Sequence, residues 1–399
     1  MSDATDTISA NSMPDQALIE RAKALQPQLR ANSKEGEAAR RLPEVDAKAL
    51  LEAGLLSIWV PKRLGGLETN VRTGVDVLAE VAYGNGAAGW VTGLINTSNW
   101  MAALQSDQAQ QDIWGVDPKS VVSTVFDANA TAEAVDGGFK FSGKWGFASG
   151  SAHSQWVNLG VFIPKPDGTE SHALVLVPAS ELTLQDTWYT TGMRATASNT
   201  WVAEDVFVPE HRVIEFGDLM ERHYNTPNAA DEPLYRAHFM PLATIIMAAP
   251  HLGMARAALD LTLETVPKRR VKYTVYEKSA DAPFVQTLVA EAASMIDAAT
   301  MLVHRMARTL DDAAAEDRDQ TGVERARARM DCGHAVTLCR EAIDKLMSVN
   351  GASAFAEFNY MQQIWRDSHT ASRHAFAEPV LGMEIYGREL LGRDRVMPI

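Results

Sequence analysis

The chain has 399 residues and a formal net charge of −14, with 46% hydrophobic and 22% charged residues. Such a length can bury the cores of about two or three domains, and this composition is that of an ordinary globular protein. The acidic balance disfavours nucleic acid or an anionic membrane surface as a partner. Neither kind of partner is therefore expected.

The first 16 residues are polar and acidic, without a basic start or an apolar run, so they do not resemble a signal peptide and are predicted to be a disordered tail. No stretch is predicted to supply the about 20 apolar residues that span a bilayer. The two cysteines, Cys332 and Cys339, follow a helical spacing and match no zinc motif. We expect a reduced, cytoplasmic protein with two helix-packing thiols and no metal site.

The N-terminal region, from 17 to about 118, has apolar residues at three- and four-residue spacing, which is typical of helices. Helices are predicted at 17–33, 43–53, 71–83 and 87–104. The central region, to about 212, instead alternates β-branched and aromatic residues with polar ones. Strands are predicted at 121–125, 139–147, 156–163, 172–177 and 200–208. Several short strands with little helix favour a small barrel or sandwich.

The C-terminal region is again helical and rich in alanine, and long antiparallel helices favour a bundle, which also tends to oligomerise. Its helices are predicted at 242–266, 283–313, 322–349 and 354–376. The order helices, strands, helices gives an α+β class without βαβ alternation, and a Rossmann or P-loop enzyme is disfavoured. The predicted division is a tail at 1–16, a helical domain at 17–118, a central β domain at 119–214 and a helical bundle at 215–399.

The most informative segment is F-S-G-K-W-G-F-A-S-G at 141–150. Strand alternation would place Trp145 and Phe147 on one face, where they could back a flat aromatic ligand. Ser149 and the backbone of Gly150 would then reach the polar edge of that ligand. The same residues also suit a β-hairpin with two core aromatics, and the segment alone leaves both interpretations open.

Three more motifs occur in a recognisable order: V-P-K-R-L-G-G at 60–66, G-M-R-A-T-A-S-N-T at 192–200 leading to V-F-V-P-E-H-R at 206–212, and G-M-A-R-A-A-L-D at 253–260. Together with the order of helices and strands, they resemble the acyl-CoA dehydrogenase superfamily over roughly 17–397. The resemblance implies an N-terminal helical domain, a central β-barrel domain and a C-terminal four-helix bundle.

Within that superfamily the chain is most similar to the oxygenase components of two-component flavin-dependent monooxygenases, of the p-hydroxyphenylacetate hydroxylase and dibenzothiophene monooxygenase type. The similarity is carried by S-G-x-W-x-F-x-S-G at 142–150, by W-R-D at 365–367 with His374, and by Gly387-Arg388. It implies that reduced flavin (FMNH2 or FADH2) and O2 form a C4a-hydroperoxide that oxygenates a small aromatic substrate of phenol or indole type. It also implies a homotetramer and a separate NAD(P)H-dependent flavin reductase. The need for a reductase agrees with the sequence, which has no nicotinamide-binding fingerprint.

The resemblance also implies roles for single residues. His374 would act as general acid or base, although the polar run 368–374 by itself also suits a histidine on a helix surface. Ser149 would bond the N5–C4 edge of the flavin. The residues implied in flavin binding are Trp145, Phe147, Ser149, Ser198, Asn199, Asn350, Gly351 and Arg366. Of these, Asn350 and Gly351 would meet the flavin of a neighbouring subunit, whereas a lone Asn-Gly would be only a helix cap.

The substrate side departs from the phenol hydroxylases of the family, which carry a histidine near the substrate on the helix that follows Trp90. Here Ser98 or Asn96 takes that place, which makes a differently anchored phenol or a neutral heteroaromatic such as indole more plausible. Ser123 lies on the predicted strand at 121–125, which precedes the strand that carries Trp145, and it would line the substrate end of the site.

Other functions remain open at this point. One is an acyl-CoA dehydrogenase-like FAD oxidoreductase, for which Glu357 and Glu378 are the nearest carboxylates although their context is not the dehydrogenase motif. Another is sulfur or amine oxygenation on the same scaffold. A third is a scaffold without catalytic activity, which would bind no flavin. The physiological substrate, the choice between FMN and FAD, and the reductase are not readable from the sequence.

Overall fold

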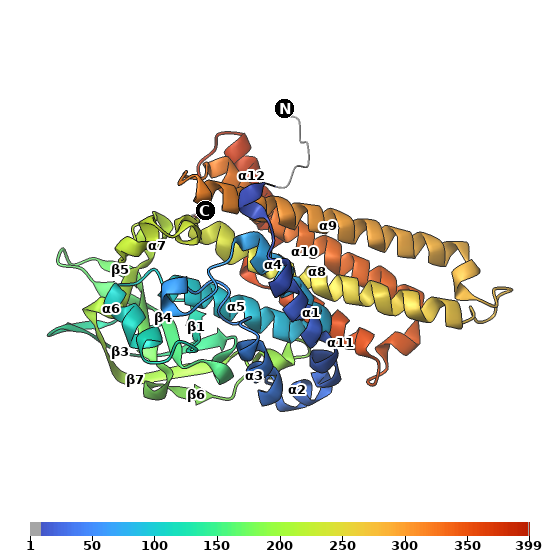
Figure 1. The fold of residues 1–399 in the computed structure, drawn as a ribbon, viewed down its shortest axis with the longest axis horizontal. Coiled ribbons are helices and arrows are strands. Elements are labelled where there is room, and N and C mark those ends of the chain that lie inside the picture. The colour runs from blue at the N-terminus through green and yellow to red at the C-terminus, as the bar shows by residue number, and fades with distance from the viewer. Residues whose placement is uncertain (1–8, 398) are drawn as a thin grey trace.

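The structure, a computed structural model, describes residues 9–397 and 399. Figure 1 shows the strands at one end of an elongated molecule and the long C-terminal helices extending toward the other end, with the N-terminal helices packed between them. The predicted order of helices, strands and helices is therefore confirmed.

The N-terminal helices are set by side-chain caps. Asp15, Asn70 and Asn85 each accept a hydrogen bond from a backbone N–H in the first turn of the helix that follows. The helices of this region are α1 (Gln16–Ala31), α2 (Ser33–Ala39), α3 (Glu44–Glu52), α4 (Val71–Gly84), α5 (Gly86–Ala102) and α6 (Asp107–Gln110). Helix α5 is buried along nearly its whole length, which makes it the inner helix against which the functional elements pack.

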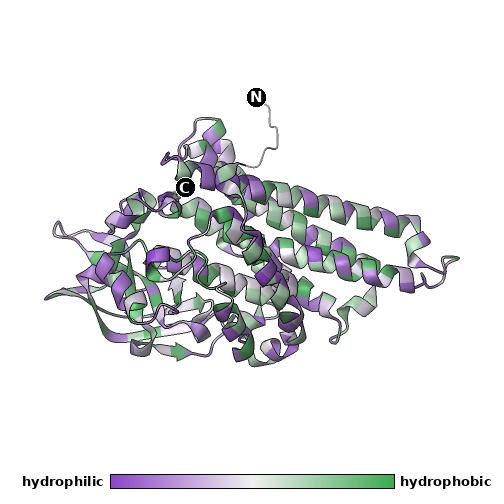
Figure 2. Cartoon of the chain, in the orientation of Figure 1, coloured by the Kyte–Doolittle hydropathy of each residue, from purple (hydrophilic) through white to green (hydrophobic). Residues whose placement is uncertain are grey.

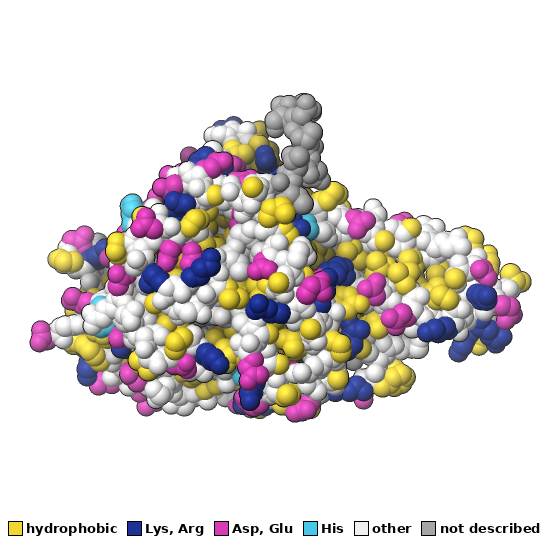
Figure 3. Space-filling model, in the orientation of Figure 1, with side chains coloured by type: hydrophobic (Ala, Val, Ile, Leu, Met, Phe, Trp, Pro, Cys, Tyr) yellow, Lys and Arg dark blue, Asp and Glu magenta, His cyan; other side chains and the backbone are white. Residues whose placement is uncertain are grey.

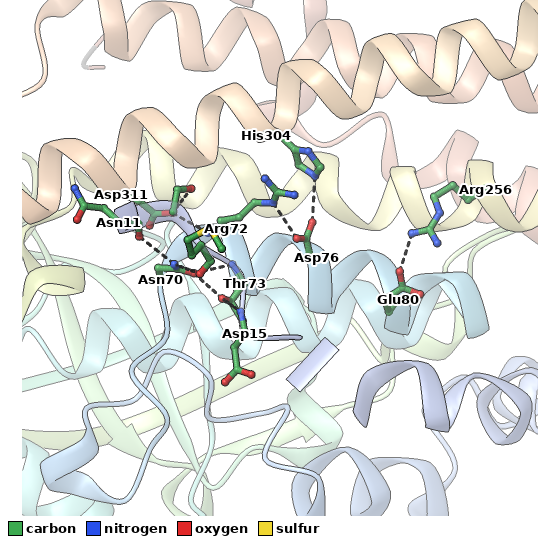
Figure 4. A network of polar contacts seen from close by, with 12 residues as sticks. Asn11, Asp15, Asn70, Arg72, Thr73, Asp76, Glu80, Arg256, His304 and Asp311 are labelled. Carbon is green, nitrogen blue, oxygen red and sulfur yellow. Dashed lines mark hydrogen bonds and ion pairs between the residues drawn. The ribbon is translucent and has the colours of Figure 1, made fainter. Parts of the chain in front are cut away.

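The tail prediction is wrong for the part that the structure describes, and residues 1–8 lie outside it. Asn70 donates to the carbonyls of Asn11 at 3.0 Å and Met13 at 2.8 Å, and Ser12 Oγ donates to Asp311 at 2.9 Å. These contacts dock the segment onto α4 and onto the long C-terminal helix α9 (Pro283–Ala315), as Figure 4 shows.

The central region forms two four-stranded sheets that share one hydrophobic core. One sheet has the order β1 (Val122–Val125), β4 (Trp156–Pro164), β5 (Glu170–Pro178), β8 (Val213–Glu215), and its β1–β4 pair is parallel. The other has the order β2 (Glu133–Val135), β3 (Gly138–Ala148), β7 (Asn199–Pro209), β6 (Thr183–Gln185). The segment that leads into β2 pairs with β4 of the other sheet at an isolated bridge, Thr131 to Phe162. A closed barrel is not found, and the sandwich alternative fits better.

The C-terminal region is built on three long helices, α8 (Phe239–Thr265), α9 (Pro283–Ala315) and α10 (Gly322–Asn350). The predicted helix at 354–376 is shorter: α11 (Tyr360–Ala371) follows a 3-10 turn at Ala352–Phe355. A further helix, α12 (Pro379–Leu390), packs on α10, and α4 packs on α8. The region is thus more than the simple four-helix bundle that was expected. A short helix, α7 (Phe216–Met220), precedes it.

Helix α8 is long and apolar enough to cross a membrane by length and composition, contrary to the sequence-based expectation. However, 89% of its most apolar window is buried inside the protein, so it is the core helix of the C-terminal region. The outer helices alternate polar and apolar residues (Figure 2), and charges of both signs are interspersed on the face seen in Figure 3. Both cysteines are buried and unpaired, and burial raises the pKa of the Cys332 thiol to about 12.

Candidate active site

A strained turn lies between β6 and β7. Met193 and Ala197 adopt left-handed φ values of 54° and 47°, which non-glycine residues rarely do. Such backbone conformations cost about 1–3 kcal/mol each and persist only where the surroundings enforce them. Here α11 enforces them: the Met193 N–H donates to Asp367 Oδ1 at 2.5 Å, and a Cβ at Gly192 would lie 2.1 Å from the Arg366 carbonyl. The turn is therefore held against α11.

A chain of three hydroxyl groups starts at this turn. Thr196 Oγ1 donates to the Met193 carbonyl at 2.9 Å, and lies 2.7 Å from Ser198 Oγ. Ser198 Oγ lies in turn 2.7 Å from Ser149 Oγ. Thr196 and Ser198 are only 1% and 3% exposed, whereas Ser149 is half-buried. The structure thus brings together Ser149 and Ser198, two of the residues predicted to bind flavin, and adds Thr196.

Trp145 and Phe147 do not share a face, which corrects the prediction. Trp145 is fully buried in the core between the sheets, and its Nε1 donates to the Gly160 carbonyl at 2.8 Å. Phe147 is 79% exposed and contacts the Trp188 ring at 5.9 Å. The cause is a break in the β3–β7 register between Trp145 and Ala148, where Phe147 has a φ of 59°. Trp145 is therefore a core residue and cannot stack on a ligand as it stands.

His374 lies just beyond α11 and is held as a neutral imidazole. Its Nδ1 accepts the Phe376 N–H at 3.1 Å, and its ring packs edge-on against Trp90 at 5.7 Å and Phe376 at 5.5 Å. Burial, with a smaller effect from the Arg329 charge, lowers the pKa of His374 to about 4. Because Nδ1 is an acceptor, the proton of the neutral ring sits on Nε2. His374 is thus arranged as a hydrogen-bond donor.

An aromatic wall continues from His374. Phe126, which directly follows β1, lies 6.4 Å from Phe376 and 5.5 Å from Phe239, centroid to centroid. Phe216 joins Phe126 at 6.4 Å and stacks on His172 at 4.8 Å. Sequence reasoning missed these residues, because isolated aromatics in apolar segments look like any core residue.

Helix α5 links the hydroxyl chain to the histidine. Gly150, next to Ser149, lies so close to α5 that a Cβ there would be 3.4 Å from both Val91 and Ile95. The adjacent Trp90 touches His374. One turn further on, Leu94 stays partly exposed whereas its neighbours on the helix are buried. The hydroxyl chain and His374 therefore lie along the same buried helix, α5.

Of the predicted substrate residues, Asn96 is fully committed elsewhere. Its Oδ1 accepts the Ile58 N–H at 2.9 Å, and its Nδ2 donates to the carbonyls of Leu55 and Thr92, both at 2.8 Å. It anchors the loop at 55–58 to α5 and is completely buried, so the structure does not support a contact between Asn96 and a substrate. Ser98 is buried on α5, 2% exposed.

Ser123 lies on the other side of its sheet from α5. It pairs with Val157, which belongs to the core between the sheets, so its side chain points into that core. Its hydroxyl is buried and has no hydrogen-bond partner among the described residues. The register therefore does not support the prediction that Ser123 lines the substrate end of the site.

The remaining predicted flavin residues make structural contacts within this chain. Asn199 Oδ1 accepts the N–H groups of Thr187 and Trp188, both at 3.1 Å. Arg366 forms an ion pair with Glu37 at 2.7 Å. Asn350 Nδ2 donates to Thr262 Oγ1 at 2.7 Å, at the end of α10 that is far from the sheets (Figure 1). Asn350 and Gly351 therefore lie far from Ser149 of the same chain.

The residues around Ser149 fit a flat ring with a polar edge. Ser149 is half-buried at the end of the hydroxyl chain, and Gly150 beside it has a φ of 76°, which lets the backbone turn and pack against α5. In contrast, Glu357 is exposed and Glu378 Oε1 caps the Val380 N–H at 3.0 Å, so neither carboxylate sits as a dehydrogenase base would. The Ser149 hydroxyl, supported from behind by Ser198, would hold a flavin here, which supplies the means of activating O2 when bound.

Two packed sheets that lie in the chain between an N-terminal and a C-terminal helical region, with this turn held against α11, are the features of the acyl-CoA dehydrogenase fold class. Residues 245–379 match the family model described as "Acyl-CoA dehydrogenase, C-terminal domain". The chain is 33% identical over 376 residues to the "Flavin-dependent monooxygenase, oxygenase subunit HsaA" of Rhodococcus jostii (strain RHA1), covering 92% of this chain and 97% of the relative. It is 32% identical to the "FADH(2)-dependent resorcinol hydroxylase, oxygenase component" of Rhizobium sp. (strain MTP-10005), covering 96% of each.

Among solved structures, XiaF from Streptomyces sp. in complex with FADH2 and glycerol has a TM-score of 0.92 and 36% sequence identity, covering 96% of this chain and 97% of that one. The chain therefore belongs to the family of oxygenase components of flavin-dependent monooxygenases. The predicted family and enzyme class are confirmed.

Proposed function

We propose that this enzyme uses O2 and reduced flavin, delivered by a separate NAD(P)H-dependent reductase, to oxygenate an aromatic ring. The observation that carries the proposal is the neutral His374 imidazole, which is flanked by Trp90 and Phe376 and continued by the aromatic wall. Such a wall suits a planar apolar substrate, and a single N–H donor within it suits one polar substituent. The name of the Rhizobium relative, a resorcinol hydroxylase, agrees with this substrate class.

The protonation of His374 favours a phenol over an indole. Because Nδ1 is engaged by Phe376 N–H, the free Nε2–H can donate to a phenol or phenolate oxygen. An indole N–H is itself a donor and would oppose it. We therefore infer that His374 stabilises negative charge on a substrate oxygen as a donor, and that indole oxidation, which Ser98 in place of a histidine left open, is the second candidate.

The assembly and location are also part of the proposal. Asn350 and Gly351 lie at the far tip of the bundle, so they would reach a flavin only in another subunit. Exposed apolar side chains on α8 and α9, namely Leu263, Phe284 and Met301, supply surface for such contacts. A cytoplasmic homotetramer built through the bundle accounts for both observations.

The test is a single turnover. The purified protein is mixed anaerobically with FMNH2 or FADH2, then with O2 and a panel of phenols and indoles, and product is compared with released hydrogen peroxide. We expect coupled hydroxylation of a phenol, and a tetrameric mass by light scattering. Peroxide without product for every aromatic compound, despite bound reduced flavin, would reject an aromatic substrate. Tight binding of oxidised flavin with bleaching by an acyl-CoA would favour the dehydrogenase alternative.

A further inference from the structure

We propose that the buried hydroxyl chain makes this site selective for reduced over oxidised flavin, and that Thr196 is the residue that sets the selectivity. The inference rests on the proposed function, because it requires the N5 edge of the flavin to meet Ser149. It concerns the direction in which each hydroxyl group of the chain points its single proton.

The direction follows from counting protons. The Met193 carbonyl can only accept, so Thr196 must use its proton in that 2.9 Å hydrogen bond. Ser198, 2.7 Å from Thr196 Oγ1, must then be the donor in their contact. Ser149, 2.7 Å from Ser198 Oγ, must likewise donate to Ser198. Its oxygen is left with lone pairs alone to offer to a ligand.

The direction is hard to reverse. Thr196 and Ser198 are almost completely buried, so water cannot replace a lost partner. The Met193 carbonyl also accepts the Trp188 Nε1–H at 2.8 Å, which keeps it in place. If Thr196 turned its proton toward Ser198, its Oγ1 would face this carbonyl oxygen lone pair to lone pair at 2.9 Å. That carbonyl is itself fixed, because the Met193 N–H is held by Asp367 and the residue lies in the left-handed region.

The two redox states of flavin differ at the atom that Ser149 would meet. In reduced flavin, N5 carries a hydrogen and donates, whereas in oxidised flavin N5 carries a lone pair and accepts. A Ser149 oxygen that can only accept forms a hydrogen bond with the reduced N5–H and faces the oxidised N5 lone pair to lone pair. The chain would therefore capture the reduced cofactor and favour release of the oxidised one after turnover.

Thr196→Val tests the inference by removing the hydroxyl while nearly keeping the shape. Ser198 then loses its acceptor, the chain is free to reverse, and Ser149 can donate to oxidised N5. We expect the ratio of Kd for oxidised flavin to Kd for reduced flavin to fall about tenfold, which corresponds to about one net hydrogen bond. The ratio is measured by fluorescence titration with oxidised FMN or FAD and by anaerobic titration with the chemically reduced forms.

Matched variants separate this effect from general disturbance. Thr337→Val removes a hydroxyl that donates to a backbone carbonyl at 2.9 Å within α10, and should leave the ratio unchanged. Thr196→Ser restores the hydroxyl and should keep the wild-type ratio. Ser198→Ala breaks the chain at its next link, so it should lower the ratio as Thr196→Val does, even where the valine variant fails to fold.

The outcomes are distinguishable. If the wild type binds reduced flavin preferentially and both Thr196→Val and Ser198→Ala keep its ratio, the inference is overturned while the proposed function stands. If the wild type binds no reduced flavin, the proposed function fails and the inference fails with it. A fall of the ratio in both variants, with Thr337→Val unchanged, supports the inference.

Discussion

Two buried polar networks of this molecule differ in whether all their hydrogen-bonding groups have partners, and this difference distinguishes a network that stabilises the fold from one that binds a ligand. Around Asp311, every partner is satisfied: its carboxylate accepts the N–H groups of Val71 at 2.6 Å and Arg72 at 3.0 Å, and the Ser12 hydroxyl at 2.9 Å (Figure 4). The chain from Thr196 to Ser149 instead ends on a hydroxyl that has no hydrogen-bond partner beyond Ser198 among the described residues. A network that only stabilises the fold closes on itself, whereas one that binds a ligand is left open.

The backbone differs in the same way. Asp311 lies in the regular helix α9 and caps the start of another helix, α4. The open chain begins at a turn in which Met193 and Ala197 are both left-handed. Strain of this kind at the open network, and its absence from the capping contacts of Asp311, agrees with the tendency of strained backbone to gather at functional sites.

The largest effect is expected from a substitution that breaks the closed network around Asp311. Asp311→Ala leaves two backbone N–H groups and the Ser12 hydroxyl without their acceptor, and we expect a loss of about 3 kcal/mol in the free energy of unfolding. Urea denaturation measures it, and flavin affinity at low temperature should not change. Asp312→Ala, at the less buried neighbour that bonds Ser9 and Asn11, is the control and should cost less than about 1 kcal/mol. Equal losses would show that the network is not what stabilises this junction.

The next effect acts on the chemistry. His374→Ala should slow oxygen transfer about 100-fold while the Kd for reduced flavin stays within about twofold. Because Nδ1 of His374 also caps the 375–377 turn, His374→Asn, whose amide oxygen can keep the cap, separates folding from catalysis. His369→Ala is the control, since His369 contacts the Trp365 ring and forms a hydrogen bond with Asp344. Normal hydroxylation by His374→Ala would remove this residue from the mechanism.

The periodicity of the sequence predicted the regular elements well. The predicted helix at 71–83 became Val71–Gly84, and the predicted strand at 156–163 became Trp156–Pro164. Both are long runs whose apolar residues repeat with one period. The three-residue strands β2, β6 and β8 and the short helix α2 gave too few repeats to be seen.

The site was only partly predictable, for reasons visible in particular residues. A bulge at Phe147 interrupts the alternation of side chains along β3, from which Phe147 was predicted to share a face with Trp145. No local sequence rule predicts such a bulge. Asn96 is one of several polar residues on a buried helix, and only its partners at 55–58 reveal it as an anchor. Phe126 and Phe376 are far apart in the chain, so their contact is a product of the tertiary fold. His374 was identified through a family resemblance, which spacing alone would not have supplied.

A third effect concerns the anchor of the open network and depends on pH. Burial raises the pKa of Asp367 to about 7, above its value of about 4 in the unfolded chain. The folded state then binds the extra proton between these values, so this group's contribution to stability is full at low pH and is lost as pH rises toward 7. Relative to the wild type, Asp367→Asn should therefore gain about 2 kcal/mol between pH 5 and pH 7.5.

Urea denaturation midpoints at the two pH values measure this gain in the stability of Asp367→Asn relative to the wild type. The comparison cancels the titration of Asp311, which both proteins share and whose pKa burial also raises to about 7. It likewise cancels the opposite contribution of His251, whose pKa burial lowers to about 4. A variant that follows the wild-type pH dependence would show that Asp367 is already ionised in the folded state at pH 5.

The smallest effects concern Trp145 and Phe147, two residues of β3 that differ in burial. Trp145→Phe removes the donor to the buried Gly160 carbonyl and leaves space in the core between the sheets, so it should cost about 2 kcal/mol in urea unfolding. Phe147→Ala, two residues on, should change stability by less than about 0.5 kcal/mol, because the ring is 79% exposed. If reduced-flavin affinity falls in Phe147→Ala but not in Trp145→Phe, the exposed ring is part of the binding surface. An unchanged affinity in both would confine the flavin contacts of this segment to Ser149.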